Sequence, residues 1–164
     1  MRGDAAAFIE LVKQHDRGLR TLAYRLLHDR TAMDDVMQDA YLKAFRGFSG
    51  FRGEAEERTW LYRIVYNACL DRLRSDGRRR EESLDALPGR ATGPGMDDPA
   101  ESVAETSALA DALASLPPDQ RAVVLLVDAA GFTYDEAAEV LGIRSGTVGS
   151  RLHDARSALR TALV

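Results

Sequence analysis

The strongest constraint on the fold lies near the carboxyl end, where residues 132–163 read FTYDEAAEVLGIRSGTVGSRLHDARSALRTAL. A short apolar run comes first, and Gly142 then supplies a residue that tolerates the left-handed backbone with which many helices end. A second apolar pattern follows at offsets of four, three and four, which defines one helical face: Val148, Leu152, Ala155 and Leu159. Ser145 precedes this pattern and is expected to cap the second helix through its hydroxyl. The stretch therefore predicts two helices joined by a tight turn.

Small and cationic side chains occupy the rest of the second helix. Gly146, Gly149 and Ser150 would let the backbone approach DNA closely, while Arg151 and His153 could reach phosphates or base edges. This layout is typical of a helix-turn-helix, whose second helix lies in the DNA major groove. An ordinary helical hairpin in an all-α core would show the same helix–Gly–helix pattern, so this stretch alone leaves both interpretations open.

Composition excludes several classes of protein. The chain has 164 residues, of which 45% are hydrophobic and 29% charged, as in globular proteins. It contains no apolar run of the ~20 residues needed to cross a bilayer, and no apolar secretory core follows its amino terminus. Its single cysteine, Cys69, rules out an internal disulfide. We therefore expect a cytoplasmic location without membrane insertion.

Charge is unevenly distributed. Residues 1–80 hold 16 Lys and Arg against 12 Asp and Glu, whereas residues 81–164 hold 6 against 14. Residues 140–164 are locally basic, with four arginines and the single acid Asp154. The net charge of −4 predicts weak DNA binding by the isolated chain, because neutralising phosphates supplies much of DNA affinity. This pattern favours a subunit that gains affinity from a larger assembly.

The first half predicts helices. Residues 5–27 form a helix, or a helix pair interrupted at Gly18, and residues 32–47 form the next helix. The core stripe of this second helix has helical period: Met33, Met37, Ala40, Tyr41, Ala44 and Phe48. Facing away from it are Asp35, Gln38, Asp39, Leu42 and Arg46. Leu42 among polar residues fits either a scattered surface leucine or the centre of a contact patch for a partner helix, and periodicity leaves both open.

Residues 48–60 are rich in glycine and charge and predict a loop, after which Thr59 is expected to cap a helix over residues 60–75. On that helix Leu61, Ile64, Val65 and Ala68 are expected to face inward. Aromatic residues and arginines lie around the remainder, an arrangement suited to unstacked nucleic acid: Tyr62, Arg63, Tyr66, Asn67, Arg72 and Arg74. Trp60 and Tyr62 could instead be core aromatics with polar tips, and for Trp60 the core position is favoured.

Residues 81–105 predict a flexible acidic linker, because Pro and Gly are frequent and no apolar period is present. Two further helices are expected after it, one from residue 106 that ends before Pro117 and one from Pro118 or Asp119. No strand pattern rises above the helical one. The expected fold class is all-α, with two small helical domains joined by the linker. No phosphate loop, catalytic set or metal-ligand spacing is present, so we expect no enzyme activity, cofactor, metal or small-molecule substrate.

Both halves together resemble the extracytoplasmic-function (ECF) sigma factors of bacterial RNA polymerase, in the sigma-70 family. In the first half the resemblance rests on DDVMQDAYLKAF at residues 34–45 and TWLYRIVYNACLDRLR at residues 59–74. In the second half it rests on Leu113, Leu116, Pro117 and Arg121, then on residues 131–142, and then on the GTV-x-SRL-x-x-AR pattern of residues 146–156. The motifs cover nearly the whole chain in the family's order.

The resemblance implies domains with boundaries at 1–80 (region 2) and 106–164 (region 4), in a factor that directs core polymerase to promoters and assists melting. Region 2 would bind the clamp helices of the polymerase largest subunit through Asp35, Gln38, Asp39, Leu42 and Arg46. It would also bind and open the −10 element through Arg52, Trp60, Arg63, Tyr66, Asn67 and Arg74. Region 4 would contact the flap of the second-largest subunit and read the −35 element with Arg144, Ser145, Gly146, Thr147, Ser150, Arg151, His153 and Arg156. An anti-sigma factor is a further implied partner.

Four positions depart from the family pattern. Glu56 and Glu57 replace residues that are often apolar or aromatic, and Gly149 and Asp154 stand where basic residues are usual. Two alternatives stay open. One is a stand-alone helix-turn-helix regulator that binds duplex DNA as a dimer, although the acidic net charge and the lack of an obvious dimerisation helix argue against it. The other is a sigma-like adaptor that binds proteins without reading DNA, which Gly149 and Asp154 keep open.

Overall fold

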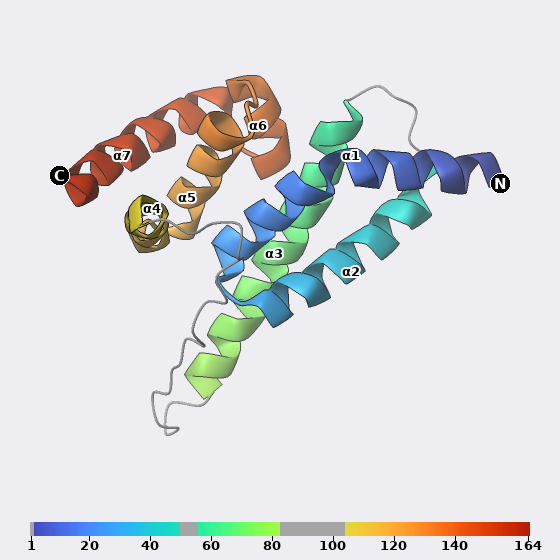
Figure 1. Ribbon diagram of the computed structural model, residues 1–164, viewed down its shortest axis with the longest axis horizontal. Helices are drawn as coiled ribbons and strands as arrows, with labels where there is room; N and C mark the ends of the chain where they lie inside the picture. Colours follow the sequence, from blue (N-terminus) through green and yellow to red (C-terminus); the bar gives the residue numbers. More distant parts are fainter. Residues whose placement is uncertain (1, 50–55, 83–103) are drawn as a thin grey trace. The chain divides into compact units, whose positions relative to one another are not determined.

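The computed structural model describes residues 2–49, 56–82 and 104–164, and in these ranges the chain is helical without strands (Figure 1). The chain divides into two compact units, residues 1–95 and residues 96–164. The all-α prediction is confirmed. Arg52 and the predicted linker between residues 83 and 103 lie outside the described residues.

Three long helices build the first unit: α1 (Arg2–Leu27), α2 (Arg30–Phe48) and α3 (Glu57–Glu82). Each of them packs against the other two. His28 adopts a positive φ of 54° between α1 and α2, and the Asp29 side chain then accepts a hydrogen bond from the Ala32 backbone N–H. An aspartate in this position satisfies one of the free N–H groups at the helix start.

Gly18 does not interrupt α1, which runs through it as one helix. Its role is to make room for another side chain, because a β-carbon at Gly18 would lie 2.2 Å from the hydroxyl oxygen of Tyr62 on α3. The core around this contact is apolar, with Leu19, Met37, Leu61, Val65 and Cys69 fully buried. Burial raises the pKa of the Cys69 thiol to about 12.

A polar network ties α1 to α2 at the edge of this core. Arg20 Nε donates to both carboxylate oxygens of Asp16, at 3.1 and 3.0 Å, and Arg20 Nη1 donates to Asp34 at 3.2 Å. The Tyr41 hydroxyl donates to the same Asp16 carboxylate at 2.5 Å. Burial, followed by this bond to Asp16, raises the pKa of Tyr41.

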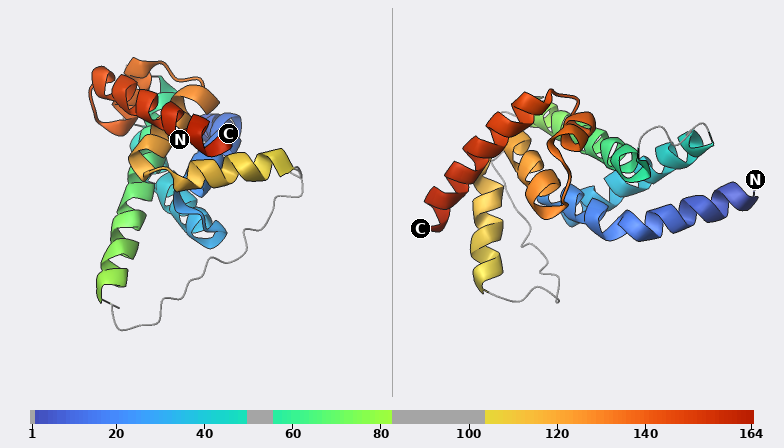
Figure 2. Two further views of the ribbon diagram at one scale, coloured as in Figure 1. Left: turned by 90° about the vertical axis from the view of Figure 1, so that its left-hand side faces the viewer. Right: turned by 90° about the horizontal axis from the view of Figure 1, so that it is seen from above.

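The second unit contains α4 (Ala104–Ser115), α5 (Pro118–Val124), a π-helical turn η1 (Leu125–Ala129), α6 (Tyr134–Leu141) and α7 (Ser145–Leu163). Pro118 starts α5, a position where its missing N–H costs nothing. Helix α7 packs against α4, α5 and α6, and Figure 2 shows it from two further directions.

The helix-turn-helix is formed by α6, the turn at Gly142, and α7. A capping box starts α6, since the Thr133 hydroxyl accepts from the Glu136 N–H while the Glu136 carboxylate accepts from the Thr133 N–H. Gly142 ends α6 with a left-handed φ of 68°, as predicted, and its N–H donates to Ala138 at 2.8 Å. Val148, Leu152 and Ala155 are fully buried, so the predicted inner face of α7 is confirmed.

Arg121 is the buried charged residue that joins α4 to α5. Its Nε donates to the Leu113 carbonyl at 2.9 Å, and its Nη2 donates to the carbonyls of Ala114 and Leu116 at 3.2 and 2.7 Å. Carbonyls at a helix end lack partners within the helix, so Arg121 stabilises the end of α4. This contact explains why the Leu113–Arg121 motif has its spacing.

Candidate nucleic-acid and polymerase interfaces

Helix α7 gathers all the side chains expected at the −35 element. Arg144 is the residue before the first turn, and it is exposed together with Gly146, Ser150 and His153. They lie away from the buried stripe of α7, on the surface that a duplex could approach. Thr147 is half-buried, and Ser150 donates to its carbonyl at 3.1 Å.

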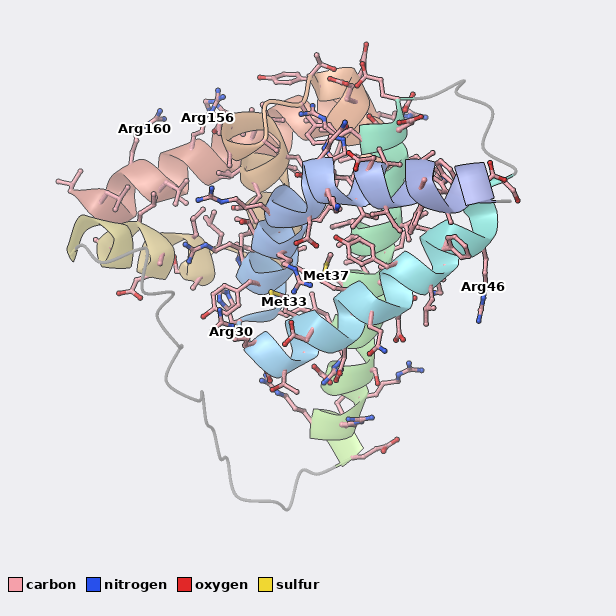
Figure 3. The ribbon with its side chains drawn as sticks, turned by 45° about the vertical axis from the view of Figure 1, so that its right-hand side comes forward. Arg30, Met33, Met37, Arg46, Arg156 and Arg160 are labelled. Atoms are coloured by element: carbon pink, nitrogen blue, oxygen red, sulfur yellow. The ribbon has the colours of Figure 1, made fainter. Side chains whose placement is uncertain are left out.

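Two arginines flank this exposed surface, and each meets an aspartate from another element. Arg156 donates to Asp128 of η1 through Nε at 3.1 Å and Nη2 at 2.6 Å. Arg151 Nε lies 3.7 Å from the Asp119 carboxylate of α5. Figure 3 shows Arg156 projecting from the same side of α7 as Arg160. The flanking cations are therefore held by the helices on which α7 packs.

The outward face of α2, defined as Asp35, Gln38, Asp39, Leu42 and Arg46, is exposed at every position, as predicted. Leu42 is 50% exposed, and Asp35 lies 3.6 Å from Arg72 Nη1 of α3. Figure 3 shows Arg46 projecting outward, while Met33 and Met37 lie on the inner side of α2. An apolar side chain in a charged surround suits a protein contact, because such contacts combine an apolar centre with a polar rim.

Helix α3 presents Arg63, Asn67 and Arg74 on its exposed surface. Arg74 Nη1 lies 4.0 Å from Asp71. Trp60 is half-buried and packs near Phe48, with ring centroids 6.3 Å apart. Phe48 is the last residue of α2 and Trp60 lies in the first turn of α3, the two helices that flank residues 50–55.

Comparison with known proteins identifies the two halves. Residues 11–79 match sigma-70 region 2, and residues 106–159 match sigma-70 region 4. The ECF RNA polymerase sigma factor SigM of Mycobacterium tuberculosis is 40% identical over 161 residues, which cover 98% of this chain and 79% of SigM. The chain belongs to the ECF sigma factors. The Escherichia coli K12 sigma-E factor is 33% identical over 96% of this chain and 87% of its own length.

A solved structure gives the same result for the fold of this sigma factor. The sigma factor RpoE of Bartonella quintana, crystallised with the anti-sigma factor NepR, matches with a TM-score of 0.81 and 28% identity over 96% of each chain. The predicted family resemblance and the helix-turn-helix fold are thereby confirmed. As a member of this family, the chain is a transcription initiation factor that directs RNA polymerase to promoters.

The structure corrects three local predictions for this sigma factor. Ser145 is the first residue of α7 rather than its cap, and its hydroxyl donates to the Asp135 carboxylate of α6. Thr59 lies inside α3 rather than before it, buried, with no partner for its Oγ1 within the described ranges. Tyr62 and Tyr66 are 4% and 5% exposed, so neither offers a free ring face for a base. They are buried because α3 packs against two helices, not one.

The sequence did not predict the residues that contact α7 and hold it in place. Asp119, Asp128 and Asp135 contact Arg151, Arg156 and Ser145 from three different elements. Local periodicity carries no signal for such contacts. The capping box at Thr133 and Glu136 was readable, since a Thr followed three residues later by Glu marks a helix start.

The described ranges contain neither a cluster of metal ligands nor a membrane-spanning helix. No group of three or more His, Cys, Asp and Glu residues there could hold a metal ion. None of the helices described is long and apolar enough to cross a membrane.

Proposed function

We propose that three surfaces of this sigma factor divide the work of initiation: α2 binds core polymerase, α3 engages the −10 element and α7 reads the −35 element. The observation that carries this proposal is the presence of both sigma regions, in order, in a chain 40% identical to SigM over 98% of its length. Region 2 occupies the first unit and region 4 the second.

The outward face of α2 is proposed to bind the clamp helices of the polymerase largest subunit. Leu42 supplies apolar area at its centre, and the polar residues around it supply the rim. The second unit would contact the flap of the second-largest subunit. These contacts hold the factor on DNA, which its net charge of −4 makes it poorly able to bind alone.

The exposed surface of α3 is proposed to bind the unpaired −10 strand. Arg63, Asn67 and Arg74 can contact backbone or base edges, and the half-buried Trp60 can stack on a base. The prediction for Tyr66 changes, because a buried ring can only support this surface from behind. Strand opening then draws on binding energy rather than chemistry, so the factor is not an enzyme.

The exposed surface of α7 is proposed to enter the major groove at the −35 element. Helices in helix-turn-helix proteins contact base edges with their N-terminal residues, here Arg144, Gly146 and Thr147. Arg151 and Arg156 flank that surface, where the two phosphate strands of a groove would lie.

An anti-sigma factor is proposed as regulator, acting in the cytoplasm where the polymerase works. The Bartonella quintana relative was solved in complex with NepR, and the relative CnrH, with a TM-score of 0.70 and 28% identity, in complex with the cytosolic domain of CnrY. A protein that covered the outward face of α2 would exclude polymerase.

Run-off transcription with purified core polymerase tests the proposed function. Adding the factor to fragmented genomic DNA should produce discrete transcripts whose upstream regions share two sequence elements. A stand-alone regulator would bind duplex DNA without core polymerase and start no transcript. An adaptor would bind polymerase and yield no promoter-specific product, and either outcome would remove the proposal.

Substitution at Leu42 tests the polymerase surface. Leu42→Asp places a charge at the apolar centre and should abolish co-purification with core polymerase. Ile9→Asp is the matched control, because Ile9 is 51% exposed on α1 and lies outside the proposed surface. Equal retention of polymerase by both variants would show that the outward face of α2 is not the contact.

A further inference from the structure

Two side chains from different elements of the second unit form an ion pair at the surface of α7. Arg156 of α7 makes a two-bond contact with the carboxylate of Asp128 in η1. This contact is the main reason why the pKa of Arg156 is raised. Paired N–H groups facing a carboxylate fix the plane of a guanidinium as well as its position. Arg156 is therefore held in one orientation although 46% of its side chain is exposed.

Gly149 lets the Tyr134 ring of α6 lie close to α7 in the same unit. The ring lies over the glycine, since a β-carbon at Gly149 would be 3.4 Å from Cε2 of Tyr134. A bulky residue here would displace the ring. The glycine that departs from the family pattern thus has a packing role beneath Tyr134.

The π-helical turn η1 supplies the carboxylate. Asp128 lies within this turn, which spans Leu125–Ala129. Such turns cost regular hydrogen-bond geometry and are frequent at functional sites. Here the turn presents a carboxylate to an arginine 28 positions away in sequence.

We propose that Asp128 is a positioning residue that holds Arg156 for a phosphate of the −35 duplex. The inference rests on the proposed function of α7. Nε and Nη2 of Arg156 face Asp128, which leaves the N–H groups of Nη1 for a phosphate oxygen. A held arginine loses little rotamer freedom when it binds, and its direction selects one backbone geometry.

Simple electrostatics predicts the opposite effect for Asp128. A carboxylate close to a phosphate repels it, so removing the charge should strengthen DNA binding. Positioning predicts that the same change weakens binding, because Arg156 is released. Whether the loss of the Asp128 charge strengthens or weakens DNA binding therefore distinguishes repulsion from positioning.

The experiment measures binding of the holoenzyme, assembled from core polymerase and this factor, to a duplex fragment of a promoter mapped by the run-off assay. Arg156→Ala should weaken binding and lower the slope of log K against log salt by about one. Asp128→Asn should weaken it roughly threefold or more while Arg156 is present, and have little effect in the Arg156→Ala background. Asp154→Asn is the matched control, since it removes an exposed charge from α7 itself, and it should leave binding unchanged or strengthen it.

Several outcomes overturn the inference while the proposed function stands. These are stronger binding by Asp128→Asn, an Arg156→Ala variant that binds like the parent, or equal losses from Asp128→Asn with and without Arg156. A holoenzyme that binds no promoter removes the proposed function and this inference with it. Thermal unfolding of each variant is measured alongside, and if Asp128→Asn lowers the Tm, binding is compared well below both transitions, where the direction of the change in affinity still decides.

Discussion

Two glycines lie inside helices beneath a tyrosine, one in each unit, and the two contacts differ in depth. Over Gly18 the hydroxyl of Tyr62 would be 2.2 Å from a β-carbon, and Tyr62 is buried between α1 and α3. Over Gly149 the ring edge of Tyr134 would be 3.4 Å away, and Tyr134 is exposed. The first distance is a clash and the second an ordinary van der Waals contact.

The difference shows that a glycine inside a helix can have more than one structural role. At Gly18 the packing of the first unit requires the missing side chain, because Tyr62 is buried in a close-packed core. At Gly149 the surface tolerates a methyl group, and only larger side chains would displace the Tyr134 ring. How deeply the tyrosine over the glycine is buried decides which of the two roles the glycine has.

Gly18→Ala should give the largest effect. Although Ala favours a helix over Gly, forcing a methyl group against Tyr62 should destabilise the protein by about 1–3 kcal/mol, the usual range for an overpacked core. Urea unfolding followed by circular dichroism measures the change. A Gly18→Ala variant more stable than the parent would show that Tyr62 can move freely.

Removing the Tyr62 hydroxyl should relieve that strain. In Gly18→Ala/Tyr62→Phe the new methyl group would meet the ring carbon Cζ at 3.5 Å, which is a normal contact. The double variant should therefore be more stable than Gly18→Ala alone, even though Tyr62→Phe by itself loses a polar group that makes interactions in the parent. If the loss in the free energy of unfolding of the double variant equalled the sum of the losses of the two single variants, the two residues would not clash.

Tyr62 should also contribute to alkaline sensitivity. Burial raises the pKa of its phenol, and the positive charge of Arg58 opposes this in part. An unfolded tyrosine ionises near pH ~10. The neutral buried phenol therefore contributes its full stability below that pH, and the contribution is lost as the pH rises towards the folded pKa. Tm should fall less steeply above pH ~10 in Tyr62→Phe than in the parent, and parallel curves would contradict this.

The sequence predicted the helices because their periodicity is local. The outward face of α2 and the inner face of α7 follow from single apolar stripes, and both are as expected. On α3 the prediction for Tyr66 was wrong, and Tyr62 takes the core position that was one of its two alternatives. Both are buried because α3 packs against α1 and α2 and buries more than one stripe. A single apolar stripe predicts which residues are buried against one neighbouring helix, whereas α3 has two neighbouring helices.

The candidate sites also contain features that the sequence could predict and features that it could not. The order of the motifs predicted which residues belong to each site, and the roles of these residues remain predictions. The contacts that hold those residues, such as Asp128 with Arg156 or Asp35 with Arg72, join positions far apart in sequence. No local pattern encodes them, because they depend on how the helices pack.

Gly149→Ala should give the smallest effect and the opposite sign to Gly18→Ala. Ala in a helix interior is favoured over Gly by about 0.5–1 kcal/mol, and the contact with Tyr134 allows the methyl group. Stability should rise by up to that amount, while holoenzyme affinity for the promoter duplex stays within error, because the ring remains above the helix. Gly149→Leu is the companion variant, since its larger side chain must displace Tyr134 and should therefore lose this gain in stability. If Gly149→Ala instead destabilised the protein as much as Gly18→Ala, the exposed tyrosine would be as rigidly held as the buried one.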